Sequence, residues 1–595
     1  MSESTIQHLS DLLKTHLDTR GSDVLVRFLP THEHETIETW TYTQLHQHAT
    51  TLAATLSTQT QVGERALIMT SRPQDFLISL FGCWYAGLVA VPVYPPNKVR
   101  RSSSLTRLQS ILKDCDASCL IMPRDLNDWM HNVHDTPHII LEEALSKDTQ
   151  FTPHDKLKPQ DIALLQYTSG STGNPKGVIL THANVLANLK LFAEIAPLQP
   201  GETVVNWMPL FHDLGLSLFL YAPFVGSSIT LLTPEGFLRR PARWLEAIST
   251  YKAAFSGAPN FAYELCHRRI SSEDMHHVDL SGWRYAMNAA EPVRAQTIDD
   301  FCKKFAPQHF SHDAMMPSYG LAEATAFGSA GRSGELPILH LDTTQLRNNI
   351  IEISNTYNES IEKNTQAFVG CGKTYLDSDV RIIHTSTNRI CNDLELGEIC
   401  LTGPQIGQGY WGQSELSSEV FGLRVDGDER PFLRTGDLGF LHDGELFVTG
   451  RLKDLIIVHG RNHYPQDIEL SVEQSTPLIR PGCVAAFTRN TSSSKHDLVA
   501  IAELRKPTDH TTYADLAETI QHTILTHHGL SLHTLVFVPP RTLHKTSSGK
   551  IQRRACRQSL GEHAFEPYFT MTWDAQQNHP THSEKPTKSL KTKTK

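Results

Sequence analysis

A run of small hydroxyl residues and glycines, followed by one lysine, occupies the stretch Tyr167–Val178. Glycine lets backbone N–H groups approach an anion closely, Ser and Thr hydroxyls add donors, and the ammonium of Lys176 adds a positive charge. The stretch is not a Walker P-loop, because Pro175 precedes the lysine and Gly177 follows it. A Ser- and Gly-rich surface turn is the alternative, but the ordered string favours a polyphosphate-binding loop. Its expected binding residues are Thr168, Ser169, Gly170, Ser171, Thr172, Gly173 and Lys176.

The same stretch resembles the phosphate loop of the adenylate-forming superfamily, which includes acyl-CoA synthetases, luciferases and the adenylation domains of peptide synthetases. The resemblance continues in order along nearly the whole chain, so coincidence does not explain it. Four further elements match, namely Met315–Glu323, Leu433–Gly439, Gly450–Arg451 and Lys545–Arg553. The resemblance implies that a carboxylate is joined to the α-phosphorus of ATP, with Mg²⁺ as the metal cofactor.

The resemblance also implies roles for side chains in these elements. The Tyr319 ring would pack on adenine, and Glu323 would bind Mg²⁺. Asp437 would hold the ribose hydroxyls, and Arg451 would contact the same ribose. Each has a structural alternative, since Glu323 could pair on a helix, Asp437 could stabilise a turn and Arg451 could form a salt bridge. The nucleotide-binding residues expected here are Ser318, Tyr319, Gly320, Asp437 and Arg451.

Two residues are expected to be catalytic and one to act as a hinge. By resemblance, Lys550 would bridge oxygens of the carboxylate and the α-phosphate, although alone it would be a solvated surface lysine. His212 would line the junction of the carboxylate site and an acyl tunnel, and its alternative is a buried core histidine. Lys453 falls at the hinge about which the small domain of these enzymes rotates between two half-reactions.

A narrower resemblance to fatty acyl-AMP ligases is carried by Leu164–Tyr167, Phe211–Leu216, Ala258–Leu265 and Gly460–Glu469. Those enzymes typically pass the acyl group to an acyl carrier protein and use coenzyme A poorly. The resemblance implies a fatty acid substrate and the phosphopantetheine thiol of a carrier protein on a separate chain. It also implies an extra segment, expected at residues 345–366, for which an ordinary surface loop is the alternative. A fatty acyl-CoA ligase and a silent relative that only binds nucleotide or acyl chains remain alternatives.

Two details depart from a simple match. The family usually has Asn-Gly-Ala-Glu-Pro near adenine, where this chain has Asn288–Pro292 with Ala289 in place of glycine. The added methyl bears on how closely the backbone can approach the nucleotide, which Ala289, Ala290 and Glu291 are expected to contact. Separately, Gly407–Gly412 satisfies the Gly-x-Gly-x-x-Gly pattern of dinucleotide sites. A lone match is weak, the bulky Tyr410-Trp411 pair would crowd a pyrophosphate, and a structural turn is the favoured interpretation.

The elements that must position these residues alternate between strand-like and helix-like runs, which predicts an α/β fold. Arg65–Met69, the helix-like Gln74–Gly87 and Val89–Val93 illustrate the pattern. We expect a large adenylating domain of several subdomains over residues 1–452 and a small mobile α/β domain over residues 453–570. Residues 571–595 are expected to form a disordered basic tail.

Composition excludes several other classes of protein. The 595 residues carry 54 Lys and Arg against 64 Asp and Glu, a net charge of −10, which argues against a nucleic-acid-binding protein. The start of the chain lacks a signal peptide, and no apolar stretch is long enough to cross a membrane. Ten cysteines in so long a chain do not indicate a disulfide scaffold, so a cytoplasmic address is expected.

Overall fold

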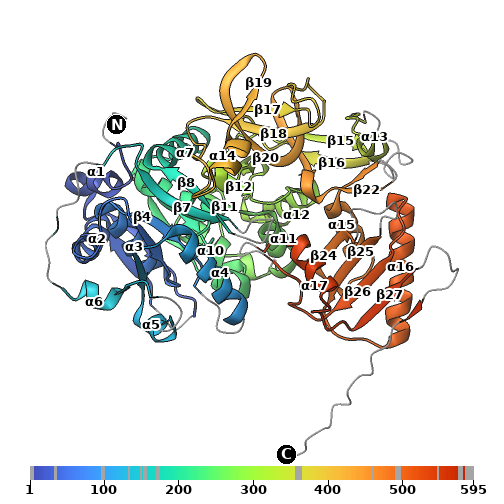
Figure 1. Cartoon of the computed structure of the whole chain (residues 1–595), viewed down its shortest axis with the longest axis horizontal. Helices are drawn as coiled ribbons and strands as arrows, with labels where there is room; N and C mark the ends of the chain where they lie inside the picture. The colour runs from blue at the N-terminus through green and yellow to red at the C-terminus, as the bar shows by residue number, and fades with distance from the viewer. Residues whose placement is uncertain are drawn as a thin grey trace, which may run out of the picture. The chain divides into compact units, whose positions relative to one another are not determined.

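The computed structural model describes residues 6–32, 36–95, 101–130, 135–147, 151, 157–168, 175–271, 273–354, 365–458, 461–489, 497–545, 549–573 and 581–582. The chain divides into two compact units. The large unit comprises residues 1–341 and 366–449, and the small unit comprises residues 342–365 and 450–595. Figure 1 shows the order of their elements along the chain.

Two mainly parallel sheets form the centre of the large unit. The eight-stranded sheet has the order β14 (Ser329–Ala330), β13 (Met315–Tyr319), β12 (Tyr285–Ala289), β11 (Ala253–Pro259), β9 (Thr203–Asn206), β10 (Ser228–Leu231), β1 (Val24–Phe28) and β2 (Glu38–Thr41). The six-stranded sheet has the order β6 (His138–Ile140), β5 (Cys119–Met122), β3 (Arg65–Ile68), β4 (Val89–Pro92), β7 (Ile162–Thr168) and β8 (Lys176–Thr181). Their inner strands are continuous apolar runs, which suits strands covered on both faces.

Helices of the large unit cover these sheets. They are α1 (Asp11–Arg20), α2 (Tyr42–Ser57), α3 (Pro73–Tyr85), α4 (Arg101–Cys115), α5 (Arg124–Met130), α6 (Leu141–Leu145), α7 (His182–Ile195), α8 (Asp213–Val225), α9 (Pro234–Arg239), α10 (Ala242–Thr250), α11 (Asn260–Arg269), α12 (Ala295–Phe305) and α14 (Ser414–Phe421), with short 3₁₀ turns η1 (Glu273–Met275), η2 (Ala306–Gln308), η3 (His312–Ala314) and η4 (Ala322–Ala324). Helix α3 packs on β3 and β4, whereas α8 packs on β9 and β10. Phe81 of α3 meets Phe219 of α8 at 6.3 Å between ring centroids. One apolar core therefore joins the two sheets through these helices.

A third, antiparallel sheet completes the large unit. It contains β17 (Asp379–Ile383), β18 (Gly397–Thr402), β20 (Asp428–His442), β19 (Leu423–Val425) and β21 (Glu445–Arg451), and a separate two-stranded sheet contains β15 (Ile338–Asp342) and β16 (Thr365–Val369). The long strand β20 carries Asp437 in its second half.

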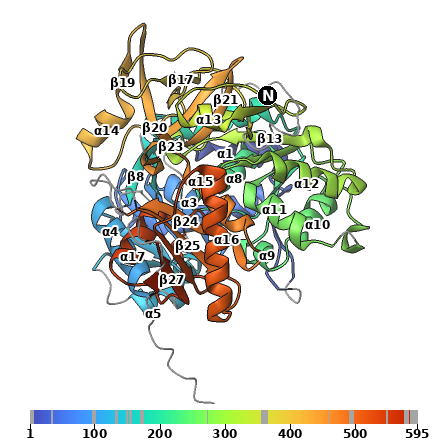
Figure 2. The ribbon, with the colours of Figure 1, turned by 90° about the vertical axis from the view of Figure 1, so that its right-hand side faces the viewer.

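The small unit is a five-stranded sheet with helices on both faces. Its elements are α13 (Thr343–Arg347), η6 (Leu452–Asp454), β22 (Ile456–Val458), β23 (Arg461–His463), α15 (Pro465–Gln474), β24 (Ile479–Thr488), β25 (Leu498–Leu504), α16 (His510–His528), β26 (Thr534–Val538), α17 (Arg553–Gly561), β27 (Phe569–Thr572) and β28 (Thr581–His582). Alternate residues of β24 face opposite cores: Val484 packs with α15 and α16, whereas Cys483 packs with α17. Figure 2 shows α16 lying along its face of this sheet.

The structure confirms the predicted α/β class with one large and one small unit. It differs from the sequence-based expectation at the tail, because residues 569–572 form β27 and Met571 is only 1% exposed. Met571 alternates with the half-buried Thr570 and Thr572, so its apolar side chain reaches the core of the small unit. Residues 574–580 and 583–595 of the expected tail lie outside the described residues. In the part of the chain that the structure covers, no helix combines the length and apolar character needed to cross a membrane.

The expected extra segment is described only in part, since residues 355–364 lie outside the described residues. Its first residues belong to the small unit by contact. The Arg347 guanidinium donates to the backbone oxygen of His527 at 2.8 Å, and the Asn462 amide donates to the Asn349 side chain at 2.7 Å. The boundaries at residue 452 and at residues 345–366 stay predictions.

Candidate active site

The stem of the expected phosphate loop is a hairpin of β7 and β8, in which Thr168 pairs with Lys176. The Tyr167 hydroxyl donates to the Asp114 carboxylate of α4 at 2.5 Å, and burial raises the pKa of this tyrosine, so it stays neutral. A Cβ on Gly177 would lie 2.9 Å from the Tyr167 ring, so glycine is needed for this packing. Ser169, Gly170, Ser171, Thr172 and Gly173 lie outside the described residues.

Lys176 and Glu323 meet on the same tyrosine. The Tyr410 hydroxyl donates to Oε1 of Glu323 at 2.8 Å, and the Lys176 ammonium lies 4.8 Å from the centroid of the Tyr410 ring. Glu323 lies in η4 and Lys176 begins β8, so residues far apart in the sequence come together here. Sequence reasoning missed Tyr410 as a site residue. The sequence did contain a signal for it: a large aromatic side chain inside a glycine-rich turn, which suggests that the ring has a specific contact.

The Gly407–Gly412 segment is not a dinucleotide turn. Its backbone runs beside β8: Ile179 N–H donates to Gly409, and Trp411 N–H donates to Gly177, at 2.9 and 2.8 Å. Because backbone amides of the segment are engaged in this pairing, they do not form the open cradle that a pyrophosphate needs.

Tyr319 and Asp437 form a second pair in the large unit. The Tyr319 hydroxyl donates to Oδ2 of Asp437 at 2.7 Å, and Asp437 is 7% exposed. A Cβ on Gly320 would lie 1.7 Å from the backbone oxygen of Ala326, so only glycine fits after the tyrosine. The Ser318 hydroxyl donates to the backbone oxygen of Met316, which gives that side chain a structural contact. The expected adenine and ribose residues are therefore adjacent.

The residues around Ala289 explain how the chain tolerates its departure from the family pattern. Ala289 ends β12, pairs with Pro259 and packs in the core of the large unit. Ala290, not Ala289, has a positive φ of 69°. The carboxylate of Glu291 accepts from the N–H of Phe261 at the start of α11, where the helix dipole favours negative charge. Glycine is therefore not required at position 289 by backbone conformation.

His212 lies immediately before α8, with its Nδ1 2.5 Å from Oδ1 of Asp213. The buried Gln166 amide donates to the backbone oxygen of Phe211 at 2.6 Å and so ties β7 to this segment. Aromatic rings gather nearby in the sequence and in the fold: Trp207 stacks on Phe237 at 3.9 Å between centroids. These rings could line an acyl tunnel or form a packed core.

The expected functional residues of the small unit are exposed. Arg451, Lys453 and Lys550 all have exposed side chains. Lys453 lies in η6, and Lys550 directly precedes Ile551, which forms an isolated bridge with Lys545. The exposed cations therefore lie at the end of β21 (Arg451), in η6 (Lys453) and beside a bridge residue (Lys550).

A partly buried ion-pair network lies next in sequence to Lys453 and near Lys550. Arg553 donates to both carboxylate oxygens of Glu469 at 2.7 and 2.8 Å and to Asp454 at 2.7 Å. Burial lowers the pKa of Arg553, but the two carboxylates outweigh it and raise that pKa above its usual value. Asp454 follows Lys453, and Arg553 lies three residues after Lys550, so one cation ties the expected hinge to the expected catalytic loop.

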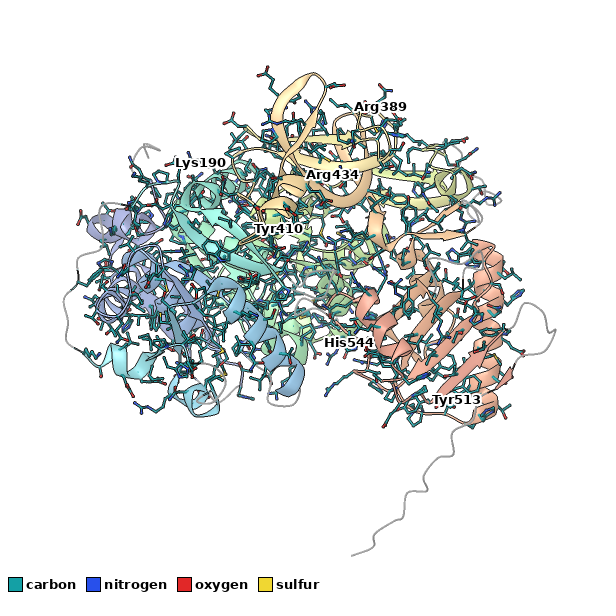
Figure 3. The ribbon with its side chains drawn as sticks, viewed as in Figure 1. Lys190, Arg389, Tyr410, Arg434, Tyr513 and His544 are labelled. Carbon is teal, nitrogen blue, oxygen red and sulfur yellow. The ribbon has the colours of Figure 1, made fainter. Side chains whose placement is uncertain are left out.

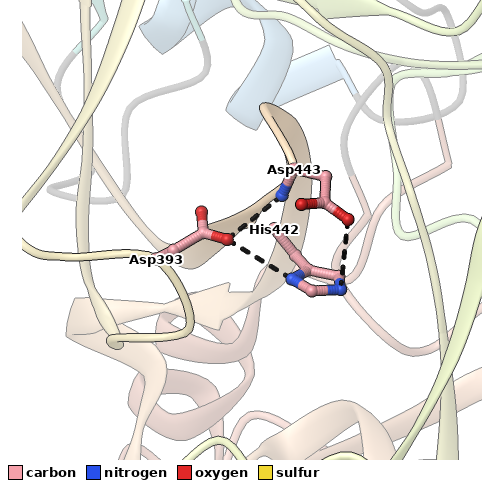
Figure 4. Close-up of side chains that lie close together, drawn as sticks. All are labelled: Asp393, His442 and Asp443. Carbon is pink, nitrogen blue, oxygen red and sulfur yellow. Dashed lines mark hydrogen bonds and ion pairs between the residues drawn. The ribbon is translucent and has the colours of Figure 1, made fainter.

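One cluster of potential metal ligands occurs among the described residues (Figure 4). It joins Asp393, from the loop between β17 and β18, to His442 and Asp443, where β20 turns into β21. The Asp443 N–H donates to Asp393 at 3.1 Å, and Asp443 has a positive φ of 52°. These contacts stabilise an exposed hairpin turn. The cluster does not include Glu323.

Two family models and several sequence relatives match this chain. The AMP-binding enzyme family matches residues 17–411, and the AMP domain of the Disco-interacting protein 2-like family matches residues 453–565. A medium-chain-fatty-acid–[acyl-carrier-protein] ligase of Moorena producens is 36% identical, over 96% of this chain and 97% of that protein. A long-chain-fatty-acid–AMP ligase of Mycobacterium marinum is 34% identical, over 85% of this chain and 86% of that protein.

A solved structure agrees with these sequence relatives. A structure from a study of fatty acyl-adenylate ligases of E. coli and L. pneumophila superimposes with a TM-score of 0.85 and 30% identity, covering 94% of this chain and 98% of that one. The resemblance to fatty acyl-AMP ligases is thus confirmed. The chain belongs to the AMP-binding enzyme family, in the part of it that includes the fatty acyl-AMP ligases.

Proposed function

We propose that this protein activates a fatty acid with ATP and then passes the acyl group to an acyl carrier protein. In the first step, a carboxylate oxygen bonds to the α-phosphorus of ATP and the bond to pyrophosphate breaks. In the second, the thiol of a phosphopantetheine arm loses its proton and attacks the acyl carbon, so that a thioester forms and AMP leaves. The observation that carries the proposal is the pairing of Tyr319 with Asp437 beside the group of Lys176, Tyr410 and Glu323 within one unit.

All nucleotide-binding groups except Arg451 are assigned to the large unit. The loop from Thr168 to Lys176 binds the β- and γ-phosphates, and the Tyr319 ring packs on adenine. The Asp437 carboxylate accepts one bond from Tyr319 and keeps lone pairs that can accept from the ribose hydroxyls. Arg451 contacts the same ribose. These assignments use side chains whose types suit each part of the nucleotide.

The Glu323 carboxylate fits a magnesium ion. Mg²⁺ is commonly held by one or two carboxylates together with substrate phosphates and water, and Glu323 supplies one hard oxygen ligand. When bound, the ion neutralises phosphate charge and helps pyrophosphate leave. The Tyr410 hydroxyl orients this carboxylate, and Lys176 adds a fixed positive charge beside it.

Lys550 supplies the cation for the reacting centre. Both reactants are anions, so their repulsion must be neutralised as the new bond forms. The Lys550 ammonium bridges carboxylate and α-phosphate oxygens, and His212 lies where the carboxylate meets the acyl chain. Lys453 serves as the hinge between the two half-reactions. None of these roles needs a covalent enzyme intermediate.

A carrier protein is the proposed acceptor, and a cytoplasmic address goes with this proposal. The ligase of Moorena producens, whose name specifies an acyl-carrier-protein acceptor, supports the choice. The described start of the 345–366 segment is held within the small unit by Arg347 and Asn349, which supports an ordered extra segment there. A coenzyme A ligase remains the alternative acceptor assignment.

Mass spectrometry tests the proposal directly. The protein is incubated with ATP, Mg²⁺ and C8 to C18 fatty acids, without acceptor, with coenzyme A or with a phosphopantetheinylated carrier protein. Acyl-AMP that persists with coenzyme A and is consumed by the carrier supports the proposal. Rapid acyl-CoA formation would assign a coenzyme A ligase instead. No acyl product with any acid would overturn fatty-acid activation and favour the silent relative.

A further inference from the structure

The segment from Gly403 to Trp411 braces two parts of the candidate site. On one side, the Gly407 N–H donates to the backbone oxygen of Glu323 at 2.9 Å. On the other, Gly409 and Trp411 pair with β8, the strand that Lys176 begins. The Asn184 amide of α7 donates to the backbone oxygen of Ile406 at 2.9 Å. The segment thus fixes the spacing between the element carrying Glu323 and the strand carrying Lys176.

Tyr410 is the side chain of this segment that reaches both residues. It is 6% exposed and lies in the interior of the large unit (Figure 3). Its N–H donates to Oγ of Ser417 at 2.8 Å, and its ring packs edge-on against Phe421 at 5.2 Å between centroids. Backbone pairing with Val178 fixes the main chain. The phenol is therefore held in one orientation before any ligand binds.

The two ends of the phenol contact groups of opposite charge. The hydroxyl donates to a Glu323 oxygen at 2.8 Å, a charge-assisted bond that fixes how the carboxylate is turned. The ring attracts the Lys176 ammonium, whose nitrogen lies 4.8 Å from the centroid. A phenylalanine would keep the second contact and lose the first, and a leucine would lose both. Comparing phenylalanine with leucine at position 410 therefore separates the hydrogen bond to Glu323 from the ring contact with Lys176.

We propose that Tyr410 is a positioning residue that presets Glu323 for the metal–triphosphate end of the nucleotide and holds Lys176 beside it. This inference rests on the proposed function, because it gives Glu323 and Lys176 the roles assigned above. Acting through these neighbours, Tyr410 touches neither the substrate nor the metal. This role accounts for the hydroxyl group of Tyr410, which packing of the ring alone does not explain.

Binding of Mn²⁺, measured by electron paramagnetic resonance with a non-reacting ATP analogue, tests the inference without turnover. We expect Tyr410→Phe to weaken Mn²⁺ binding by about tenfold, the equivalent of one charge-assisted hydrogen bond. In turnover assays the same variant should need more Mg²⁺ for half-maximal acyl-AMP formation. Tyr410→Leu should additionally raise the KM for ATP, because Lys176 loses its contact.

Two controls separate positioning from general damage. Trp411→Phe changes the next aromatic residue, which packs near Arg65, and should leave Mn²⁺ binding unchanged. In a Glu323→Gln background, Tyr410→Phe should cause little further loss, because the hydroxyl acts through that carboxylate. An equal loss in both backgrounds would indicate a merely structural tyrosine.

The outcomes distinguish this inference from the proposed function. Wild-type protein that forms no acyl-AMP would overturn the function, while the Mn²⁺ titration would still report on Tyr410. Wild-type activity combined with unchanged Mn²⁺ affinity and Mg²⁺ dependence in Tyr410→Phe would overturn the positioning role alone.

Discussion

The large and small units hold their candidate functional residues in opposite ways. In the large unit, Asp437 and Glu323 each accept a hydrogen bond from a tyrosine fixed by the surrounding fold. In the small unit, Lys550 and Arg451 project from exposed positions. Carboxylates that are already oriented suit the binding of a nucleotide, because the protein side chains lose little conformational freedom when it binds.

The small unit has its fixed contacts next to these exposed cations. Its partly buried Arg553 joins Asp454, the neighbour of Lys453, to Glu469 of α15. Long cationic side chains on a rigid base can take up different positions without disturbing the fold beneath them. The comparison teaches that most nucleotide-binding groups are preset in the large unit. The small unit supplies exposed cations, Arg451 for the ribose and Lys550 for the chemical step.

The largest effect is expected from removing the small unit's catalytic cation. Lys550→Ala should lower the rate of acyl-AMP formation by about 10²–10³-fold, because charge developing on the phosphoryl oxygens loses its stabilisation. Quantifying acyl-AMP over time checks this. Arg557→Ala, in the same basic run, is the matched control and should retain the wild-type rate. A normal rate in Lys550→Ala would refute the mechanism.

Breaking the partly buried network should destabilise the small unit. Arg553→Met leaves Glu469 and Asp454 without their shared cation, which should cost about 1–2 kcal/mol because both carboxylates keep some contact with water. Hydrogen exchange measured by mass spectrometry on the full chain should show faster exchange in α15 and α17. The exposed Arg505→Met should leave exchange there unchanged. Protection as in the wild type would mean that the network does not hold these turns.

Removing the ribose-binding carboxylate should weaken nucleotide binding. Asp437→Ala is expected to raise the KM for ATP by about 10–30-fold, since hydrogen bonds to a charged group are lost. Steady-state kinetics check the split between KM and kcat. Asp428→Ala, at the start of the same strand, is the control and should keep the wild-type KM. An unchanged KM in Asp437→Ala would remove this residue from the nucleotide site.

The small unit should become less stable in mild acid. Burial, with nearby Arg347 and Arg461, lowers the pKa of His463 to about 4. The unfolded chain binds a proton near pH 6.5 and the folded one only near pH 4, so stability present above pH 6.5 is lost as pH falls toward 4. We expect about 1–2 kcal/mol from this histidine over that range. Urea unfolding across these pH values checks it, and His463→Gln should flatten the dependence.

The smallest effect is expected at the residue that departs from the family pattern. Ala289 has ordinary strand conformation and packs in the core, so Ala289→Gly should leave the KM for ATP unchanged. It should lower stability by about 0.5–1 kcal/mol through backbone entropy. Kinetics and thermal unfolding measure the two effects. A clearly improved KM would show that the methyl does hinder the nucleotide.

Much of the fold could be predicted from the sequence because its signals are local. The strand-like Arg65–Met69 and Val89–Val93 and the helix-like Gln74–Gly87 correspond to β3, β4 and α3, because residue types and their periods mark them. The expected start of the tail was wrong, because Phe569, Met571 and Trp573 alternate with Thr570 and Thr572 as in a half-buried strand. The pattern is local, but the strand that pairs with it, β26, lies on the other side of α17 in the sequence.

Side-chain pairing in the site could not be predicted in the same way. Motifs singled out Tyr319, Asp437 and Glu323, but nothing local indicates that the Tyr319 hydroxyl reaches Asp437. Tyr410 was missed because its partners, Lys176 and Glu323, come from two distant segments that only the folded chain brings together. The roles assigned to these residues stay proposals that the experiments above test.

Calorimetric titration with an unreactive acyl-adenylate analogue, with a sulfamate in place of the phosphate, tests most directly the division between binding and chemistry. Wild type, Lys550→Ala and Asp437→Ala are compared. The account predicts that Lys550→Ala binds within about threefold of wild type, whereas Asp437→Ala binds about tenfold or more weakly. If Lys550→Ala lost as much affinity as Asp437→Ala, binding would not reside in the large unit, and the central claim would be contradicted.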